Sequence, residues 1–531
     1  HLSIRRQRQM CIRDSSESAR HLKSDAKGAK QTPSDRGASH SDRKAPQQRR
    51  NRQRNENTKR HQNQRRSSGG NKPNKTPAHE HHRDVPRYVA WQALFRVDTE
   101  NAFGNIVLPS LMKEYGLSGR DAAFTTELGY GSLRAQGLVD AVIGECSSRP
   151  LEAIDPAVIA VLRLGTYQLL RMRVGNHAAV NTSVDLCQEV DKPKAKGFVN
   201  AVLHPVAQRT ESEWIDHLTK NADPFERMAL ATAHPEWIVK VFRDSLGDYA
   251  ISELSDALIA DDARPRVHLV ARPGEITAEE LALITGGEQT SYSPYGVVLE
   301  EGDPGAIPAV REGMAAVQDE GSQLIARAAA EAPLEGDETG QWLDLCAGPG
   351  GKTALMACLA RIDGAHVDAV EPVPHRARLV EKTTSGLPVT VHTVDGRQSG
   401  LEAHYDRTLV DAPCTGLGAL RRRPEARWRK SPDDVPGLVT LQRELLAAGA
   451  ELTHPGGIVV YSTCSPHLEE TVKIVDWAEK NCPLQPLDTV DYMCGMHHCR
   501  AGENAVQMWP HRHGTDAMFV QIFRRSATPE R

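Results

Sequence analysis

The feature that most constrains this chain is a regular alternation of short apolar runs and helical segments between residues 317 and 525. Several runs have the length and the β-branched content of buried strands. They are Trp342–Leu345, Ala365–Val370, Val389–Val394, Thr408–Val410 and Ile458–Tyr461. Helical stretches such as Thr353–Ala360 separate them. Because strands that alternate with helices form a parallel sheet covered on both faces, we expect a doubly wound α/β domain over residues 311–525.

Two of these runs lead into cysteines. Cys414 stands in Asp411-Ala412-Pro413-Cys414, and Cys464 stands in Ser462-Thr463-Cys464. The carboxyl ends of parallel strands meet at the crevice where open α/β sheets bind ligands, so we expect both thiols in one cleft. A thiolate there suits covalent attack on an electrophilic ring carbon, and Asp411 can supply a proton or a hydrogen bond to that ring. Either cysteine alone would more often be a small buried side chain, but their paired positions favour catalysis.

A glycine-rich turn follows the first apolar run and leads into a helix. It comprises Cys346, Ala347, Gly348, Pro349, Gly350, Gly351 and Lys352. Glycines at this crossover let the backbone pass close to a ligand. Glu371 ends the second run and can accept hydrogen bonds from ribose hydroxyls, while Asp395 ends the third and can accept the amine of an adenine. This arrangement predicts S-adenosylmethionine, since the spacings of ATP-binding and nicotinamide-binding loops are missing.

Charge is distributed unevenly along the 531 residues. Residues 1–84 carry 22 Lys+Arg against 8 Asp+Glu, whereas the rest of the chain carries 43 and 61. Large apolar residues are scarce in the first segment, so we expect a disordered basic tail that attracts RNA. Residues 1–15 resemble translated read-through of a sequencing adapter and carry no inference.

Neither a membrane-spanning run nor a secretory signal is present, and ten cysteines form no disulfide framework, so we expect a cytoplasmic protein.

Two further units precede the α/β domain. Between residues 86 and 208 apolar residues recur at intervals of three and four, with a helix start at Asp155-Pro156, which predicts an all-α domain. Between residues 224 and 310 helical and strand patterns mix. Residues 237–242 are helix-like, and Arg266–Val270 alternates as a half-buried strand. We expect a small α+β domain there.

Several motifs occur in the order typical of one family. They are Val317–Leu324, Asp344–Thr353, Asp411–Gly416, Arg422–Trp428 and Ser462–Ser465. Together they resemble the Nop/Sun family of RNA cytosine-C5 methyltransferases, and the α/β domain is thereby expected to be a Rossmann-like methyltransferase core. Residues 86–208, with Gly197–Leu203 as their signature, resemble the RNA-binding NusB fold. A NusB unit fused to this core is typical of bacterial Sun (RsmB-like) enzymes, which implies 16S ribosomal RNA as the substrate.

The resemblance implies a covalent mechanism. Cys464 would add to C6 of a cytosine, Cys414 would assist breakdown of the adduct, and Asp411 would hydrogen-bond N3 of the base beside the cofactor. Lys352 would orient Asp411, or would be a solvated lysine at a helix start. No family motif is recognised over residues 483–502.

An arginine-rich run follows Cys414. Phosphate contacts and a stacking face are offered by Arg422, Arg423, Arg427 and Trp428, although a charge run can also be solvated surface.

No metal site is expected, because the cysteines and histidines over residues 494–499 match no closed zinc spacing. We expect a monomer. Two other interpretations stay open: the same chemistry on transfer RNA, and a non-catalytic NusB-type RNA-binding factor.

Overall fold

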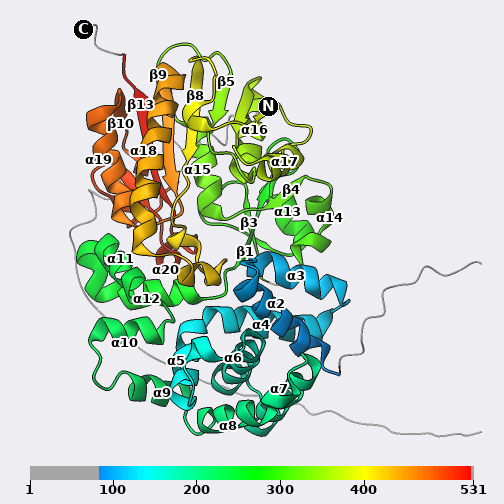
Figure 1. The fold of residues 1–531 in the computed structure, drawn as a ribbon. Coiled ribbons are helices and arrows are strands. Elements are labelled where there is room, and N and C mark those ends of the chain that lie inside the picture. The colour runs from blue at the N-terminus through cyan, green and yellow to red at the C-terminus, as the bar shows by residue number, and fades with distance from the viewer. Residues whose placement is uncertain (1–82, 301, 528–531) are drawn as a thin grey trace, which may run out of the picture. The chain divides into compact units, whose positions relative to one another are not determined.

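The computed structural model describes residues 83–300 and 302–527, so the predictions for residues 1–82 lie outside the described residues. The described chain forms a helical amino-terminal region, a small antiparallel sheet and a large mixed sheet with helices on both faces (Figure 1). Within this range no helix combines the length and the apolar content needed to cross a membrane.

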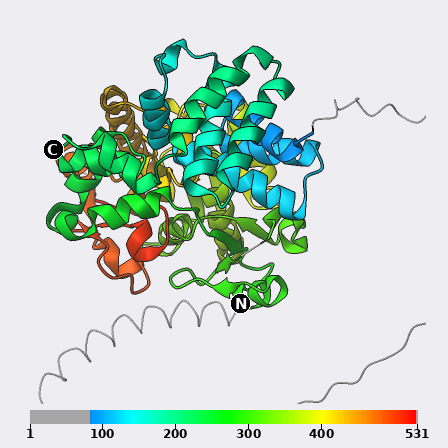
Figure 2. The same ribbon diagram turned by 90° about the horizontal axis from the view of Figure 1, so that it is seen from below.

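The amino-terminal region is a helical bundle, as predicted. Its α-helices are α2 (Val85–Thr99), α3 (Gly104–Glu114), α4 (Gly119–Arg134), α5 (Gln136–Cys146), α6 (Pro156–Arg171), α7 (Asn176–Glu189) and α8 (Lys196–Val206). Helix α6 begins behind an Asp155 cap and packs against α2, α4, α5, α7 and α8, so it is the centre of the bundle. Figure 2 shows the helices of this region, in blue to blue-green, packed together. Gly165 permits this packing, because a Cβ there would lie 2.7 Å from the Cδ1 atom of Leu203 in α8.

Four more helices connect the bundle to the sheets. They are α9 (Glu211–Leu218), α10 (Pro224–Ala231), α11 (Glu236–Leu246) and α12 (Ala250–Asp262). Thr210 and Asp223 begin α9 and α10 with capping boxes. The buried faces of α11 and α12 form one apolar cluster with Leu417, Leu420 and Trp509 of the large-sheet domain. These helices therefore pack against the large-sheet domain.

The small sheet has the antiparallel order β2-β3-β1-β4. Its strands are β1 (Val267–Ala271), β2 (Glu288–Gln289), β3 (Gly296–Leu299) and β4 (Ala315–Val317), with helices α13 (Ala278–Thr285) and α14 (Pro308–Arg311). The organisation differs from the single α+β unit predicted over residues 224–310, because residues 224–262 are largely helical and β4 extends the sheet beyond residue 310. Strand β4 has three residues, too few for an alternating pattern to identify it.

The large sheet has the order β11-β12-β13-β9-β8-β5-β6-β7, and β10 also pairs with β13. Its strands are β5 (Gln341–Asp344), β6 (His366–Val370), β7 (Val389–His392), β8 (Tyr405–Asp411), β9 (Thr453–Thr463), β10 (Leu484–Pro486), β11 (Arg500–Ala501), β12 (Ala505–Gln507) and β13 (Phe519–Arg525). Strands β5 to β9 pair in parallel, as predicted. Strand β13 runs antiparallel to β9, β10 and β12, so the prediction of a wholly parallel sheet is wrong on this side.

Helices cover both faces of the large sheet, as predicted. They are α15 (Glu320–Glu331), α16 (Gly351–Asp363), α17 (Pro374–Thr383), α18 (Val435–Leu452), α19 (Val472–Asn481) and the short α20 (Pro510–His513). Trp342 and Leu409 share an apolar core with α15 and α16. Their neighbours Leu343 and Val410 enter a second core with α18 and α19. Successive residues of β5 and β8 thus enter opposite cores, as in a parallel strand buried on both faces.

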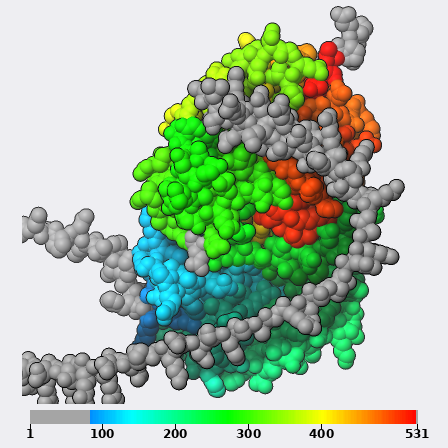
Figure 3. Space-filling model, turned by 180° about the vertical axis from the view of Figure 1, so that it is seen from behind, coloured from blue at the N-terminus to red at the C-terminus, as the bar shows by residue number. Residues whose placement is uncertain are grey.

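The small sheet contacts the carboxyl-terminal part of the large-sheet domain. The rings of Tyr292, between β2 and β3, and His513, in α20, are 6.2 Å apart. The backbone N–H of Tyr292 donates to the carboxylate of Glu320 at 2.6 Å. Figure 3 shows the two regions side by side, in green and red. These contacts hold the small sheet beside the start of α15.

Candidate active site

The carboxyl ends of β8 and β9 bring two thiols together. Asp411 of β8 lies opposite Ser462 of β9 in the parallel register, so the segments that follow each strand leave the sheet at the same edge. Cys464 comes directly after β9, and Cys414 lies three residues beyond β8. Their Sγ atoms are 3.4 Å apart, within hydrogen-bonding distance for sulfur. The two cysteines therefore share one site.

The two thiols have different acidities. The hydrogen bond with Cys414 lowers the pKa of Cys464, and the positive charge of Lys352 acts in the same direction. The same hydrogen bond and burial raise the pKa of Cys414 well above its usual range. A thiolate is the nucleophilic form of cysteine. The pKa values of the two thiols are therefore shifted in opposite directions, with that of Cys464 lowered.

Asp411 is held between two donors beside the thiols. The Lys352 ammonium lies 2.8 Å from Oδ2 of Asp411, and the Ser462 hydroxyl donates to Oδ1 at 2.8 Å. Burial alone would lower the pKa of Lys352, but the Asp411 carboxylate outweighs it and raises the pKa. Lys352 is therefore not a solvated lysine in this structure. It forms an ion pair that orients Asp411.

The glycine-rich turn joins β5 to α16. Gly350 has a φ of 107°, a conformation that glycine adopts without strain, and it caps α16. Next to the turn, Asp344 is buried, which raises its pKa to about 6, and the Thr353 hydroxyl donates to it at 2.7 Å. The turn thus brings the backbone close to the edge of the sheet where the strands end.

Glu371 faces this turn from the end of β6. It is 2% exposed, and the backbone N–H of Val373 donates to its Oε1 at 3.0 Å. A Cβ on Gly348 would lie 2.0 Å from Oε2 of Glu371, so the glycine makes room for the carboxylate. A buried acidic acceptor beside a glycine turn suits the ribose of an adenosine. The residues present therefore fit S-adenosylmethionine.

Asp395 follows β7 and is more exposed than Glu371. Its side chain is 46% exposed and forms an ion pair with Arg397 at 2.7 Å. Hydrogen bonds from Arg397 lower the pKa of Asp395. Both carboxylate oxygens accept from this guanidinium. In this structure the Asp395 carboxylate is therefore occupied by Arg397.

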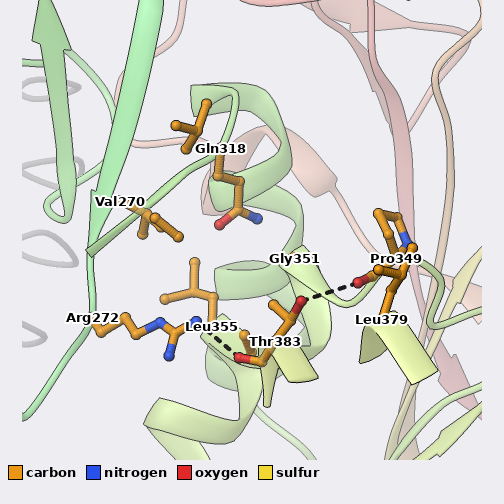
Figure 4. Close-up of a pocket in the computed structure, with 11 residues that line it drawn as sticks. Val270, Arg272, Gln318, Pro349, Gly351, Leu355, Leu379 and Thr383 are labelled. Carbon is orange, nitrogen blue, oxygen red and sulfur yellow. Dashed lines mark hydrogen bonds between the residues drawn. The ribbon is translucent and has the colours of Figure 1, made fainter. Parts of the chain in front are cut away.

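A cavity of about 220 Å³ lies on the other side of the turn, between the small sheet and α16 (Figure 4). Val270 and Val317 line it from the small sheet, and Leu355 lines it from α16. The Nε2 atom of Gln318 is buried there and has no hydrogen-bond partner within the described range. Neither thiol lines this cavity.

The first arginines after Cys414 are paired with acids of the same domain. Arg421 and Arg422 donate to the two oxygens of Asp516 at 2.6 and 2.7 Å, and Arg422 also donates to Asp319 at 2.8 Å. The Arg421 side chain is 7% exposed and that of Arg422 is 26% exposed. This network fixes the loop after Cys414 to the start of α15, and it leaves little of either guanidinium free for a phosphate.

Arg427 lies in a 3-10 helix, η7 (Pro424–Trp428), and is fully buried. Its guanidinium donates to Asp262 at 2.8 Å and to the carbonyl of Ala233 at 3.0 Å. The prediction that Arg427 contacts RNA is wrong, because its side chain has no exposed surface. Arg423 is exposed, and Trp428 is 38% exposed. Both side chains keep exposed surface, although the Trp428 ring packs against Gly137 and the Arg423 guanidinium lies over the Phe103 ring.

Three acidic residues in or near the site had no role in the sequence analysis. Asp319 stands in the recognised motif Val317–Leu324, which is the signal that could have identified it. Asp516 lies in His511–Phe519, a segment that also resembles the family pattern, whereas Glu470 stands outside the recognised motifs and its partner Thr415 lies 55 residues away along the chain. Among residues 83–300 and 302–527 there is no group of three or more His, Cys, Asp or Glu that could hold a metal ion.

The parallel strands β5 to β9, the antiparallel β13 and the glycine-rich turn after β5 define an S-adenosylmethionine-dependent methyltransferase fold, here joined to a NusB-like bundle. The family is shown by comparison with known proteins. The model of the family "16S rRNA methyltransferase RsmB/F" matches residues 331–524, and that of the NusB family matches residues 84–208. The chain belongs to the RsmB/F family.

Individual relatives agree with this assignment. "Putative methyltransferase Rv1407" of Mycobacterium tuberculosis (strain ATCC 25618 / H37Rv) is 54% identical over 450 residues, which are 83% of this chain and 97% of the relative. "Ribosomal RNA small subunit methyltransferase B" of Pseudomonas putida is 32% identical over 402 residues, which are 73% of this chain and 88% of the relative. The solved structure titled "Crystal Structure of PH0851" shares the fold, with a TM-score of 0.70 at 22% identity, and covers 83% of this chain and 98% of that chain.

Proposed function

We propose that this protein methylates C5 of a cytosine in 16S ribosomal RNA through a covalent adduct between Cys464 and C6 of the base. The observation that carries the proposal is the hydrogen-bonded thiol pair, with Sγ atoms 3.4 Å apart and with acidities shifted in opposite directions. Relatives named ribosomal RNA small subunit methyltransferase B support this choice of RNA.

Cys464 starts the reaction. An electron pair of its thiolate forms the bond to C6. The electron pair of the C5–C6 π bond then makes C5 nucleophilic enough to accept a methyl group. Asp411 stabilises the adduct, because N3 takes up a proton from water as the displaced electron pair moves into the ring, and the resulting N3–H donates to the Asp411 carboxylate until N3 returns the proton on release. Lys352 and Ser462 keep that carboxylate in place.

Cys414 assists release. After methylation the C5 proton passes to a base, the C5–C6 double bond re-forms, and the pair of the S–C6 bond returns to Cys464. The Cys414 thiol can then restore its hydrogen bond to the departing thiolate, which stabilises the leaving group. Two thiols are needed because Cys464 is bonded to the base when this help is required.

S-adenosylmethionine supplies the methyl group. We assign its methionine part to the turn from Cys346 to Lys352, its ribose to Glu371 and its adenine to Asp395. The support for Glu371 is its burial opposite Gly348. Asp395 would have to share its carboxylate with Arg397.

RNA would reach the thiols past the loop after Cys414. Arg423 and Trp428 are the exposed members of that loop, so we assign phosphate and stacking contacts to them. The target base has to leave any stack, which costs least in single-stranded or loop RNA.

Bisulfite sequencing of ribosomal and transfer RNA from a deletion strain tests the proposal. We expect one 16S cytosine to lose its methyl group, to regain it with the wild-type gene and to stay unmodified with Cys464→Ala. A lost methyl group in transfer RNA alone would refute the ribosomal substrate. Unchanged methylation in all RNA would refute the enzymatic role and favour a non-catalytic RNA-binding factor.

A further inference from the structure

A buried carboxylate connects the two cysteine segments. Glu470 is the last residue of the 3-10 helix η9 (Leu468–Glu470) and is fully buried. Its Oε1 accepts from the backbone N–H of Thr415 at 2.8 Å and from Nε2 of Gln442 at 3.1 Å. Its Oε2 accepts from the hydroxyls of Thr415 and Ser465. These contacts from three residues hold the buried carboxylate in a single orientation.

The partners of Glu470 lie next to the reactive thiols. Thr415 is the neighbour of Cys414, and Ser465 is the neighbour of Cys464. Gln442, from α18, also donates to the carbonyl of Pro413 at 2.9 Å, on the other side of Cys414. Glu470 is itself anchored, since the Tyr461 hydroxyl donates to its backbone carbonyl at 2.8 Å. One side chain therefore links the segment after β8 to the segment after β9.

We propose that Glu470 is a positioning residue of the methyl-transfer reaction, whose carboxylate holds the segments of Cys414 and Cys464 at the separation where one thiol donates a hydrogen bond to the other. This inference rests on the proposed covalent mechanism. No contact between Glu470 and the base is required, because it acts through Thr415 and Ser465.

The charge of Glu470 adds a second effect. The hydrogen bond with Cys464 and burial are the larger causes of the raised pKa of Cys414, and the negative charge of Glu470 acts in the same direction. Glu470 thus helps to keep Cys414 protonated, which is the state in which it can donate to Cys464.

Glu470→Gln is the decisive variant, because glutamine has the same shape but no charge and brings an NH₂ group where Glu470 has an acceptor. Glu470→Ala removes the link completely. The matched control is Glu469→Gln, since the Glu469 side chain is 41% exposed and pairs with Lys473 on the surface of the same segment. All variants are made in the full chain.

The first measurement is steady-state methylation. We expect kcat to fall by at least about tenfold in Glu470→Gln, because small displacements of reacting groups cost this much or more. The KM values for RNA and S-adenosylmethionine should change less than about twofold, since ground-state binding is kept. Glu469→Gln should match the wild type. Unchanged kcat in Glu470→Gln would overturn the inference. A fall in kcat that comes with weaker cofactor binding and a lower melting temperature would also overturn it, because it would indicate a general structural defect.

The second measurement needs no RNA. Alkylation of each cysteine by iodoacetamide is followed against pH by mass spectrometry. In Glu470→Gln the alkylation of Cys414 should begin at a lower pH than in the wild type, because the negative charge that opposes its ionisation is gone. Identical profiles for wild type, Glu470→Gln and Glu469→Gln would show that Glu470 does not act on the thiols.

A wild-type control separates this inference from the proposed function. Wild-type protein is incubated with S-adenosylmethionine and RNA containing 5-fluorocytosine, in which fluorine at C5 blocks the proton loss needed for release. If no adduct forms on Cys464, the covalent mechanism fails and the inference falls with it. If the wild type forms the adduct, and Glu470→Gln methylates and releases RNA with unmodified cytosine at the wild-type rate, only the inference about Glu470 is overturned.

Discussion

Replacement of Cys414 by alanine is expected to trap the enzyme on its RNA. The thiols lie 3.4 Å apart, and in the proposed last step the Cys414 S–H would donate to the departing Cys464 thiolate. A hydrogen bond to a charged group contributes about 1.5 to 3 kcal/mol. Each 1.36 kcal/mol is a factor of ten in rate, so release should slow by about ten- to hundredfold. Addition should slow less, because a thiolate that loses a hydrogen bond is also the stronger nucleophile.

Denaturing gels with labelled RNA and S-adenosylmethionine measure how much release slows relative to addition. Cys414→Ala should accumulate a denaturant-resistant protein–RNA adduct, whereas Cys464→Ala should form neither adduct nor methylated product. Cys414→Ser keeps an O–H donor and should restore part of the release rate. An adduct that persists in Cys464→Ala and disappears in Cys414→Ala would refute the reasoning, because it would make Cys414 the nucleophile.

Further predictions concern the cofactor, the stability, the RNA contacts and the tail. Glu371→Ala should weaken S-adenosylmethionine binding by about 1.5 to 3 kcal/mol in calorimetry, and unchanged affinity would refute the ribose assignment. Burial raises the pKa of Asp344 to about 6, so the folded state binds more protons than the unfolded state below that pH. The free energy of unfolding should therefore fall as pH rises from about 4 to about 6, and Asp344→Asn should remove this slope in urea titrations. Arg423→Ala and Trp428→Ala should weaken RNA binding in filter assays, and wild-type affinity in both would remove them from the RNA contact. Deleting residues 16–82 should lower the slope of log affinity against log salt and leave the methylated cytosine unchanged, and a different methylated position would show that the tail selects the target.

The sequence predicted the parallel part of the fold because each buried strand is a continuous apolar run. Leu343 and Leu409 are fully buried and stand in short apolar runs. Strands β10 to β12 could not be predicted in this way, because each has only two or three residues. Strands β10 and β12 pair with β13, and β11 pairs with β12, and local periodicity carries no information about such partners.

The residues of the candidate site could likewise be predicted only in part from the sequence. Cys414, Cys464 and Asp411 could be identified because a strand end determines where a side chain is delivered. The sequence favours RNA contact by Arg427 because this arginine stands in a basic run beside Cys414. Its partner Asp262 is 165 residues away, so no local pattern indicates that this charge is neutralised inside the protein. Burial of a charge depends on tertiary partners, and these cannot be identified from the sequence alone.

The position of β13 has a consequence for synthesis. This strand covers the edge of β9, the strand that delivers Cys464, yet it leaves the ribosome later than every other strand of the large sheet. Until Phe519–Arg525 emerges, β9 is an unpaired edge with an apolar face, which is a surface prone to pairing with other chains. The catalytic sheet therefore has to be completed late in translation or after it, while the helical bundle, which depends on local contacts, is free to fold much earlier.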